Sequence, residues 1–144
     1  MFQLPPDHEE IHIQLPSILH TCNYFLRPVI QLDYLKFDDF VDSEVFQKFI
    51  QPPEDKRAAF IQILNSYKST APFILLTVIN KITFEIVGFA AMFNNNGIVS
   101  LCLDIQDQND DIVEVLTKYI NSFGFDQVQV HLKGNLDKSG FWDV

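Results

Sequence analysis

Basic side chains are scarce in this sequence, and that scarcity excludes two classes of partner. The 144 residues include 10 Lys and Arg but 19 Asp and Glu, which gives a net charge of −9. An acidic surface repels phosphate backbones and anionic lipids, and no stretch holds five basic residues in a row. We therefore expect binding neither to nucleic acid nor to a membrane surface. A simpler interpretation of the acidic charge is that it keeps the protein soluble.

Long apolar runs are absent as well. No stretch approaches the roughly 18 consecutive apolar residues of a transmembrane helix. Residues 1–10 are rich in proline and acidic side chains, without the basic start and the apolar stretch of a signal peptide. These absences predict an intracellular, cytoplasmic protein.

Cysteine and histidine are few, and neither residue type indicates a metal site. Cys22 and Cys102 each stand among apolar residues, so we interpret both as small buried side chains; a disulfide between them stays open. No Cys and His stand at zinc-ligand spacing. Asp107, Asn109 and Asp111 alternate as in a calcium loop, but the Gly and Glu that complete such a loop are missing. Capping of the helix that follows is the better interpretation of these three residues.

The composition predicts one globular domain. Hydrophobic residues make up 47% of the sequence and charged residues 20%, and a chain of this length forms a single core. The 14 phenylalanines can fill that core, and some of them can line a surface patch for a partner. Pro5 and Pro6 oppose regular structure, so we predict an irregular arm over residues 1–10 and a single domain over 11–144.

Apolar periodicity predicts an alternation of strands and helices. The turns at 80–83 and 94–97 join three of the strands into an antiparallel meander. Asn109 and Gly124 bound the last helix, and the strands on either side of that helix are expected to run parallel. The predicted strands are 11–15, 24–29, 73–79, 86–93, 98–105 and 128–132, and the predicted helices are 37–50, one from about 54, and 110–123.

The order of these elements, together with short motifs, resembles the GNAT-type N-acetyltransferases over about residues 20–142. The motifs are Tyr24 to Pro28, Glu85 to Ala90 with a glycine after an Ile-Val pair, Gly124 to Val128, and Asn135 followed by Ser139-Gly140-Phe141. The resemblance implies an α/β fold with a mixed, mostly antiparallel sheet flanked by helices. Because the chain stops within twelve residues of the last predicted strand, we expect this sheet to be truncated after its fifth strand.

In this family the fourth strand holds the pantetheine arm of acetyl-CoA. A glycine-rich loop at the start of the next helix holds the pyrophosphate, through free backbone N–H groups. For an active enzyme, the resemblance therefore implies acetyl-CoA as the cofactor. It assigns cofactor binding to Leu103, Ile105, Gln106, Asn109 and Asn135, the role of general base to Asp104, and the role of acid for the leaving thiolate to Ser139.

The segment that matches the glycine-rich loop departs from the family pattern. Residues 106–111 contain no Gly, Arg or Lys but three carboxylates. Like charges in a partly dry site oppose a pyrophosphate by roughly several kcal/mol. Our first hypothesis is therefore a catalytically degenerate domain without a cofactor, which binds another protein or copies of itself at an exposed sheet edge. The alternative is an active N-acyltransferase that transfers an acetyl group from acetyl-CoA to an amine, and the acidic surface would suit a basic acceptor.

Overall fold

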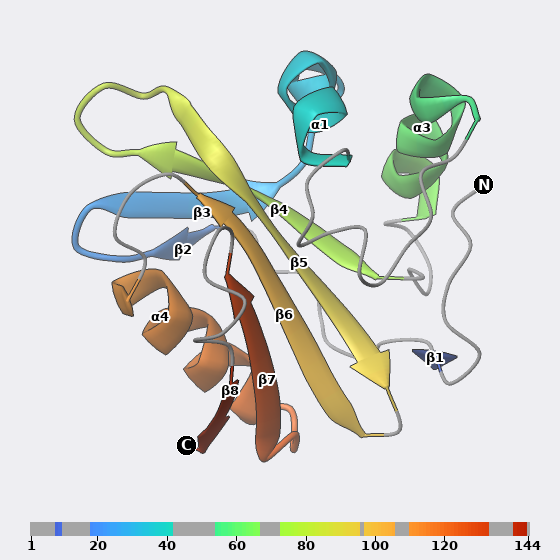
Figure 1. Ribbon diagram of the computed structural model, residues 1–144. Coiled ribbons are helices and arrows are strands. Elements are labelled where there is room, and N and C mark those ends of the chain that lie inside the picture. The colour runs from blue at the N-terminus through green and yellow to red at the C-terminus, as the bar shows by residue number, and fades with distance from the viewer. Residues whose placement is uncertain are drawn as a thin grey trace.

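The computed structural model describes residues 8–9, 18–41, 54–66, 73–95, 97–105, 110–132 and 140–143. These residues form one mixed sheet with helices on both of its faces, which is the α/β architecture that the sequence predicts (Figure 1). The predicted strand at 11–15, most of the predicted arm and residues 42–50 of the first predicted helix lie outside the described residues.

The sheet is antiparallel except at one pair of strands. Its strands lie in the order β2-β3-β4-β5-β6-β7-β8, with β1 beside β5. The meander of β4, β5 and β6 is confirmed, and so is the parallel pairing of β6 with β7. The strands are β1 (His8–Glu9), β2 (Leu19–His20), β3 (Tyr24–Pro28), β4 (Ile74–Asn80), β5 (Ile86–Asn95), β6 (Ile98–Ile105), β7 (Gln127–Leu132) and β8 (Gly140–Asp143).

The described helices follow the prediction, with shifted starts. Helix α1 begins at Tyr34 rather than Phe37, because the chain enters it through a 3-10 turn. Helix α3 begins just after Asp55, whose Oδ1 accepts a hydrogen bond from the Ala58 N–H at 3.0 Å. In the part of the chain that the structure describes, no helix is long and apolar enough to cross a membrane. The helical elements are η1 (Gln31–Asp33), α1 (Tyr34–Val41), α3 (Lys56–Ser66) and α4 (Asp110–Asn121).

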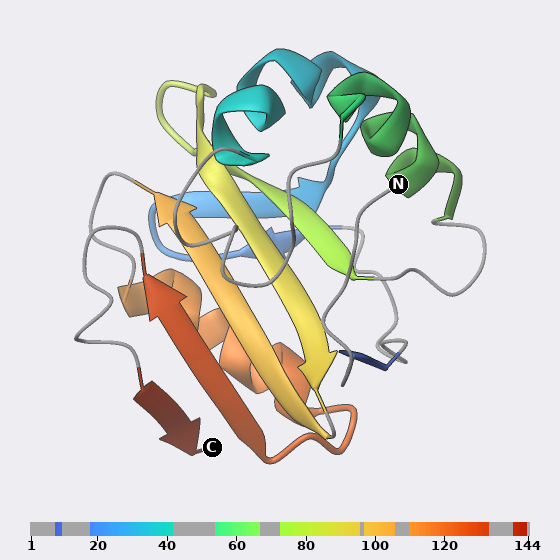
Figure 2. The ribbon, with the colours of Figure 1, turned by 45° about the vertical axis from the view of Figure 1, so that its right-hand side comes forward.

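Helices cover both faces of the sheet (Figure 2). Each face buries its own apolar cluster. On one face, α4 packs residues such as Leu116 against Leu101 and other side chains of the sheet. On the other face, α1 and α3 pack aromatic side chains, and the ring centroids of Phe37 and Phe60 lie 4.8 Å apart. Strand residues alternate between the two faces, so the central strands are apolar along both sides.

The sheet does not end at β7. Strand β8 pairs antiparallel with it, from Gln127↔Asp143 to Val130↔Gly140 (Figure 2). The prediction of a sheet that is truncated after its fifth strand omitted β8. A segment of four residues is too short to show a strand periodicity in the sequence. The outer strands of the described sheet are therefore β2 and β8.

The two cysteines occupy different environments. Cys102 is buried on β6, as predicted, whereas Cys22 is exposed, so the prediction of a buried Cys22 is wrong. Cys22 lies in the turn between β2 and β3, where the chain reverses at the surface and its side chains face solvent. Neither cysteine forms a disulfide bond.

Candidate functional site

The candidate site lies where β6 ends and α4 begins. Leu103 and Ile105 close β6 with side chains buried in the cluster that α4 covers. Asp104 between them is partly buried, and strand alternation places it on the opposite face of the sheet. The other predicted site residues, which are Gln106, Asn109, Asn135 and Ser139, lie outside the described residues, so their roles remain predictions.

Strand β6 extends beyond its parallel neighbour. The ladder between β6 and β7 runs from Val99↔Val128 to Leu103↔Leu132. Asp104 and Ile105 follow the last of these pairs, and on their other side they pair with Phe89 and Gly88 of β5. This projecting end of β6 is the place along which the family resemblance puts the pantetheine arm.

Gly88 is the residue that lets β5 approach this end of β6. A Cβ atom added at Gly88 would lie 1.9 Å from the backbone oxygen of Asp104, a distance that no side chain can tolerate. The pairing of β4 with β5 also shifts here, because Val78 pairs with Gly88 whereas Ile79 pairs with Ile86. The glycine that follows the Ile-Val pair therefore has a steric reason, which is the close approach of the Asp104 carbonyl group.

The start of α4 carries its own anions. Asp110 and Asp111 stand in the first turn, where the helix dipole favours negative charge. Asp111 Oδ1 accepts a hydrogen bond from the Ile112 N–H at 3.0 Å, so a donor that could hold a phosphate is already engaged. Asp111 Oδ2 is buried and has no hydrogen-bond partner among the described residues. The first turn of α4 therefore carries two carboxylate groups.

A partly buried ion pair that was not predicted from the sequence ties η1 to the sheet. The Arg27 guanidinium donates to both carboxylate oxygens of Asp33, at 2.7 and 3.1 Å. The Ile30 N–H and the Thr77 hydroxyl also donate to Asp33 Oδ2, at 2.9 and 2.8 Å. In the sequence, the signal for this pair was an acidic residue six positions after Arg27. Thr77, 44 positions after Asp33, gave none, because only the fold brings it close.

These contacts set the charge state of Asp33. Burial by itself would raise the pKa of the carboxyl group. The hydrogen bonds from Arg27, Ile30 and Thr77, with the positive charge of Arg27, outweigh burial and lower the pKa below the ordinary value of 3.8. Asp33 is therefore an anion at neutral pH and keeps Arg27 in place.

His131 lies on the face of the sheet opposite α4. It is buried on β7 and is the register partner of Cys102 on β6. His131 was not predicted as a site residue. In the structure it is a cross-strand neighbour of Cys102. Among the residues that the structure describes, no three His, Cys, Asp or Glu side chains gather in a way that could hold a metal ion.

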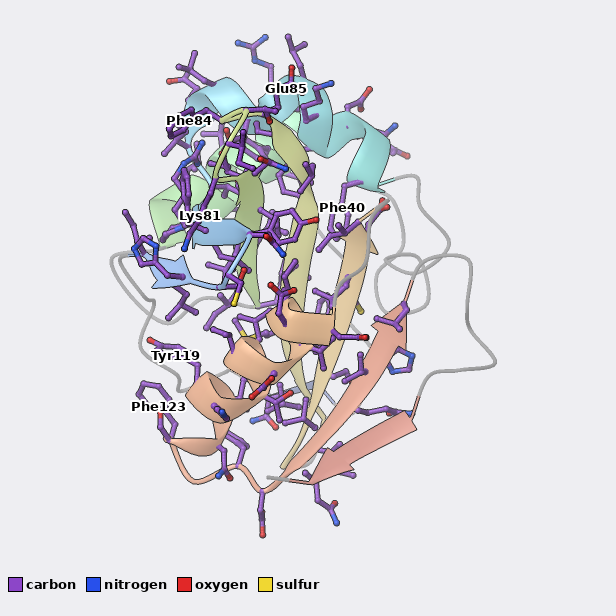
Figure 3. The ribbon with its side chains drawn as sticks, turned by 90° about the vertical axis from the view of Figure 1, so that its left-hand side faces the viewer. Phe40, Lys81, Phe84, Glu85, Tyr119 and Phe123 are labelled. Atoms are coloured by element: carbon purple, nitrogen blue, oxygen red, sulfur yellow. The ribbon has the colours of Figure 1, made fainter. Side chains whose placement is uncertain are left out.

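The turn between β4 and β5 exposes two large apolar side chains, which we call the β4–β5 tip. Ile82 is 85% exposed and Phe84 is 73% exposed. Phe84 adopts a positive φ of 59°, which is strained for a bulky side chain, and its ring centroid lies 6.4 Å from that of Phe25. Figure 3 shows Phe84 beside Lys81 and Glu85 at one end of this view, and Tyr119 and Phe123 of the α4 region at the other.

Comparison with solved structures identifies the fold. An acetyltransferase from Agrobacterium tumefaciens is similar with a TM-score of 0.60 at 15% identity, over 90% of this chain and 81% of the other. A probable GNAT-family acetyltransferase from Chromobacterium violaceum is similar with a TM-score of 0.56 at 15% identity, over 89% and 71%. No protein-family model and no curated protein matches the chain. At these identities the likeness shows a shared fold.

Proposed function

We propose that this chain, which has the fold of the GNAT acetyltransferases, is a catalytically degenerate domain that acts by binding another protein within a larger assembly. The observation that carries the proposal is the pair of carboxylates at the start of α4. In the family this helix end receives a pyrophosphate. Here the position is acidic, and one of its backbone donors is bonded to Asp111.

The electrostatic cost explains why such a site would reject acetyl-CoA. Two unit charges 4 Å apart interact by about 1 kcal/mol in bulk water and by about 4 kcal/mol near a protein surface. Two carboxylates that face a pyrophosphate multiply this repulsion. The resulting loss of binding free energy for acetyl-CoA is larger than the roughly 1.4 kcal/mol that corresponds to a tenfold change in affinity.

Exposed apolar side chains support the protein-binding half of the proposal. The β4–β5 tip and the outward side of the first helical segments present large aliphatic and aromatic groups to solvent. The predicted open edge along β7 is covered by β8, so edge pairing with a partner would use β2 or β8 instead. The most exposed of these side chains are Leu32, Leu35, Ile82 and Phe84.

Calorimetric titration with acetyl-CoA tests the degenerate site. We expect no binding at millimolar concentration for the wild-type chain. The double variant Asp110→Asn/Asp111→Asn removes the two carboxylates of the first helical turn, and we expect it to bind at least tenfold more tightly than the wild type. Glu114→Gln is the matched control, because Glu114 is exposed in the same helix and pairs with Lys118 at 2.9 Å. Micromolar binding by the wild type would overturn the proposal.

The proposal that the chain binds another protein needs a separate measurement. Pull-down from the source cell with the wild-type chain should recover a defined protein, and Ile82→Ser/Phe84→Ser should lose it if the β4–β5 tip takes part. Sedimentation of the purified chain distinguishes a partner from self-association. A monodisperse monomer that binds no hydrophobic dye and recovers nothing would contradict the protein-binding function.

A second candidate function is an active N-acyltransferase, which the projecting end of β6 favours. In this reading the acyl donor lies along Asp104 and Ile105, and the acceptor amine attacks the thioester carbonyl directly. Asp104 would accept the amine proton, and the C–S bond of the thioester would break to release the CoA thiolate. Incubation with acetyl-CoA and a broad panel of amines tests this candidate, with Asp126→Asn as an exposed acidic control for Asp104→Asn. Absence of turnover across the panel would eliminate it.

A further inference from the structure

We draw no further inference here: the strongest candidate, the exposed β4–β5 tip formed by Ile82 and the strained Phe84 beside Phe25, is an unpartnered apolar surface, and nothing in the structure shows what covers it.

Discussion

The Asp33 carboxylate joins three segments of the fold, because it accepts hydrogen bonds from Arg27 of β3, from the Ile30 N–H and from Thr77 of β4. We predict that Asp33→Asn lowers the free energy of unfolding by about 2–4 kcal/mol, since Arg27 loses its charge partner in a largely buried place. Urea unfolding followed by circular dichroism measures this change. The control is Asp38→Asn, whose carboxylate pairs with Lys56 at 3.3 Å with 47% of its side chain exposed. The control should lose less than about 0.5 kcal/mol, and equal losses would contradict the argument.

The lowered pKa of Asp33 also gives its contribution a pH dependence. Because the pKa is lower in the folded chain than the ordinary 3.8, the unfolded chain binds more protons as the pH falls through this range. The stabilisation from Asp33 is therefore complete above about pH 5 and is lost as the pH falls through 3.8 toward the folded pKa. Unfolding at several pH values should show a smaller acid-induced loss in Asp33→Asn than in the wild type. A parallel loss in both proteins would show that other carboxyl groups carry the effect.

Gly88 and Gly97 are glycines for two different physical reasons, which are lack of space at Gly88 and a positive φ at Gly97. We predict that Gly88→Ala destabilises the chain by about 3 kcal/mol or more, because its Cβ would collide with the backbone of Asp104 and no flexible side chain can yield. Gly97→Ala adds no collision but forces alanine into a φ of +85°, so we expect a loss of only about 1 kcal/mol. Thermal unfolding of the two variants compares them. A harmless Gly88→Ala would mean that β5 and β6 move apart easily.

At the scale of elements, α4 buries a hydroxyl group that its packing does not use. The Thr117 hydroxyl is buried and has no hydrogen-bond partner among the described residues. We predict that Thr117→Val, which keeps the shape and removes the hydroxyl, raises the free energy of unfolding by about 1 kcal/mol. Thr77→Val is the matched control on β4, and it should lower stability by about 1–2 kcal/mol because Thr77 donates to Asp33 at 2.8 Å. Stabilisation by both variants would argue against the Asp33 network.

Elements whose own residues carry a periodic signal could be predicted from the sequence. The recurrence of apolar residues from Ile112 to Phe123 places α4 almost to its observed bounds, Asp110–Asn121. Gly124 lies in the turn that follows the helix, where its φ is +94° and its N–H donates to the Asn121 carbonyl oxygen at 3.0 Å. The start of α1 and the existence of β8 could not be predicted in this way. Each depends on a partner elsewhere: the carboxylate of Asp33 is fixed by β3 and β4, and β8 exists by pairing with β7.

At the scale of the whole molecule, the sequence predicted the class of the fold and only part of the site. The order of elements predicted a GNAT-like sheet, and the similarity to solved acetyltransferases supports that prediction. The absence of glycine between Gly97 and Gly124 raised the objection to phosphate binding. The hydrogen bond from the Ile112 N–H to Asp111 adds a structural observation to that objection. The close contact of Gly88 with Asp104 could not be predicted from the sequence, because the pattern of side chains does not encode the distance between the backbones of β5 and β6.

The mixture of neighbouring and distant strand pairs also has a consequence for how the chain acquires its structure. Strands β4, β5 and β6 are joined by tight turns, so their contacts close short loops and we expect them to form early. Pairing of β3 with β4 closes a longer loop that contains η1, α1 and α3. Pairing of β6 with β7 requires the chain to cross over through α4 first. During synthesis, the apolar face of the meander therefore emerges before the helix that covers it. In that interval the nascent chain, more than the finished domain, is the species at risk of aggregation.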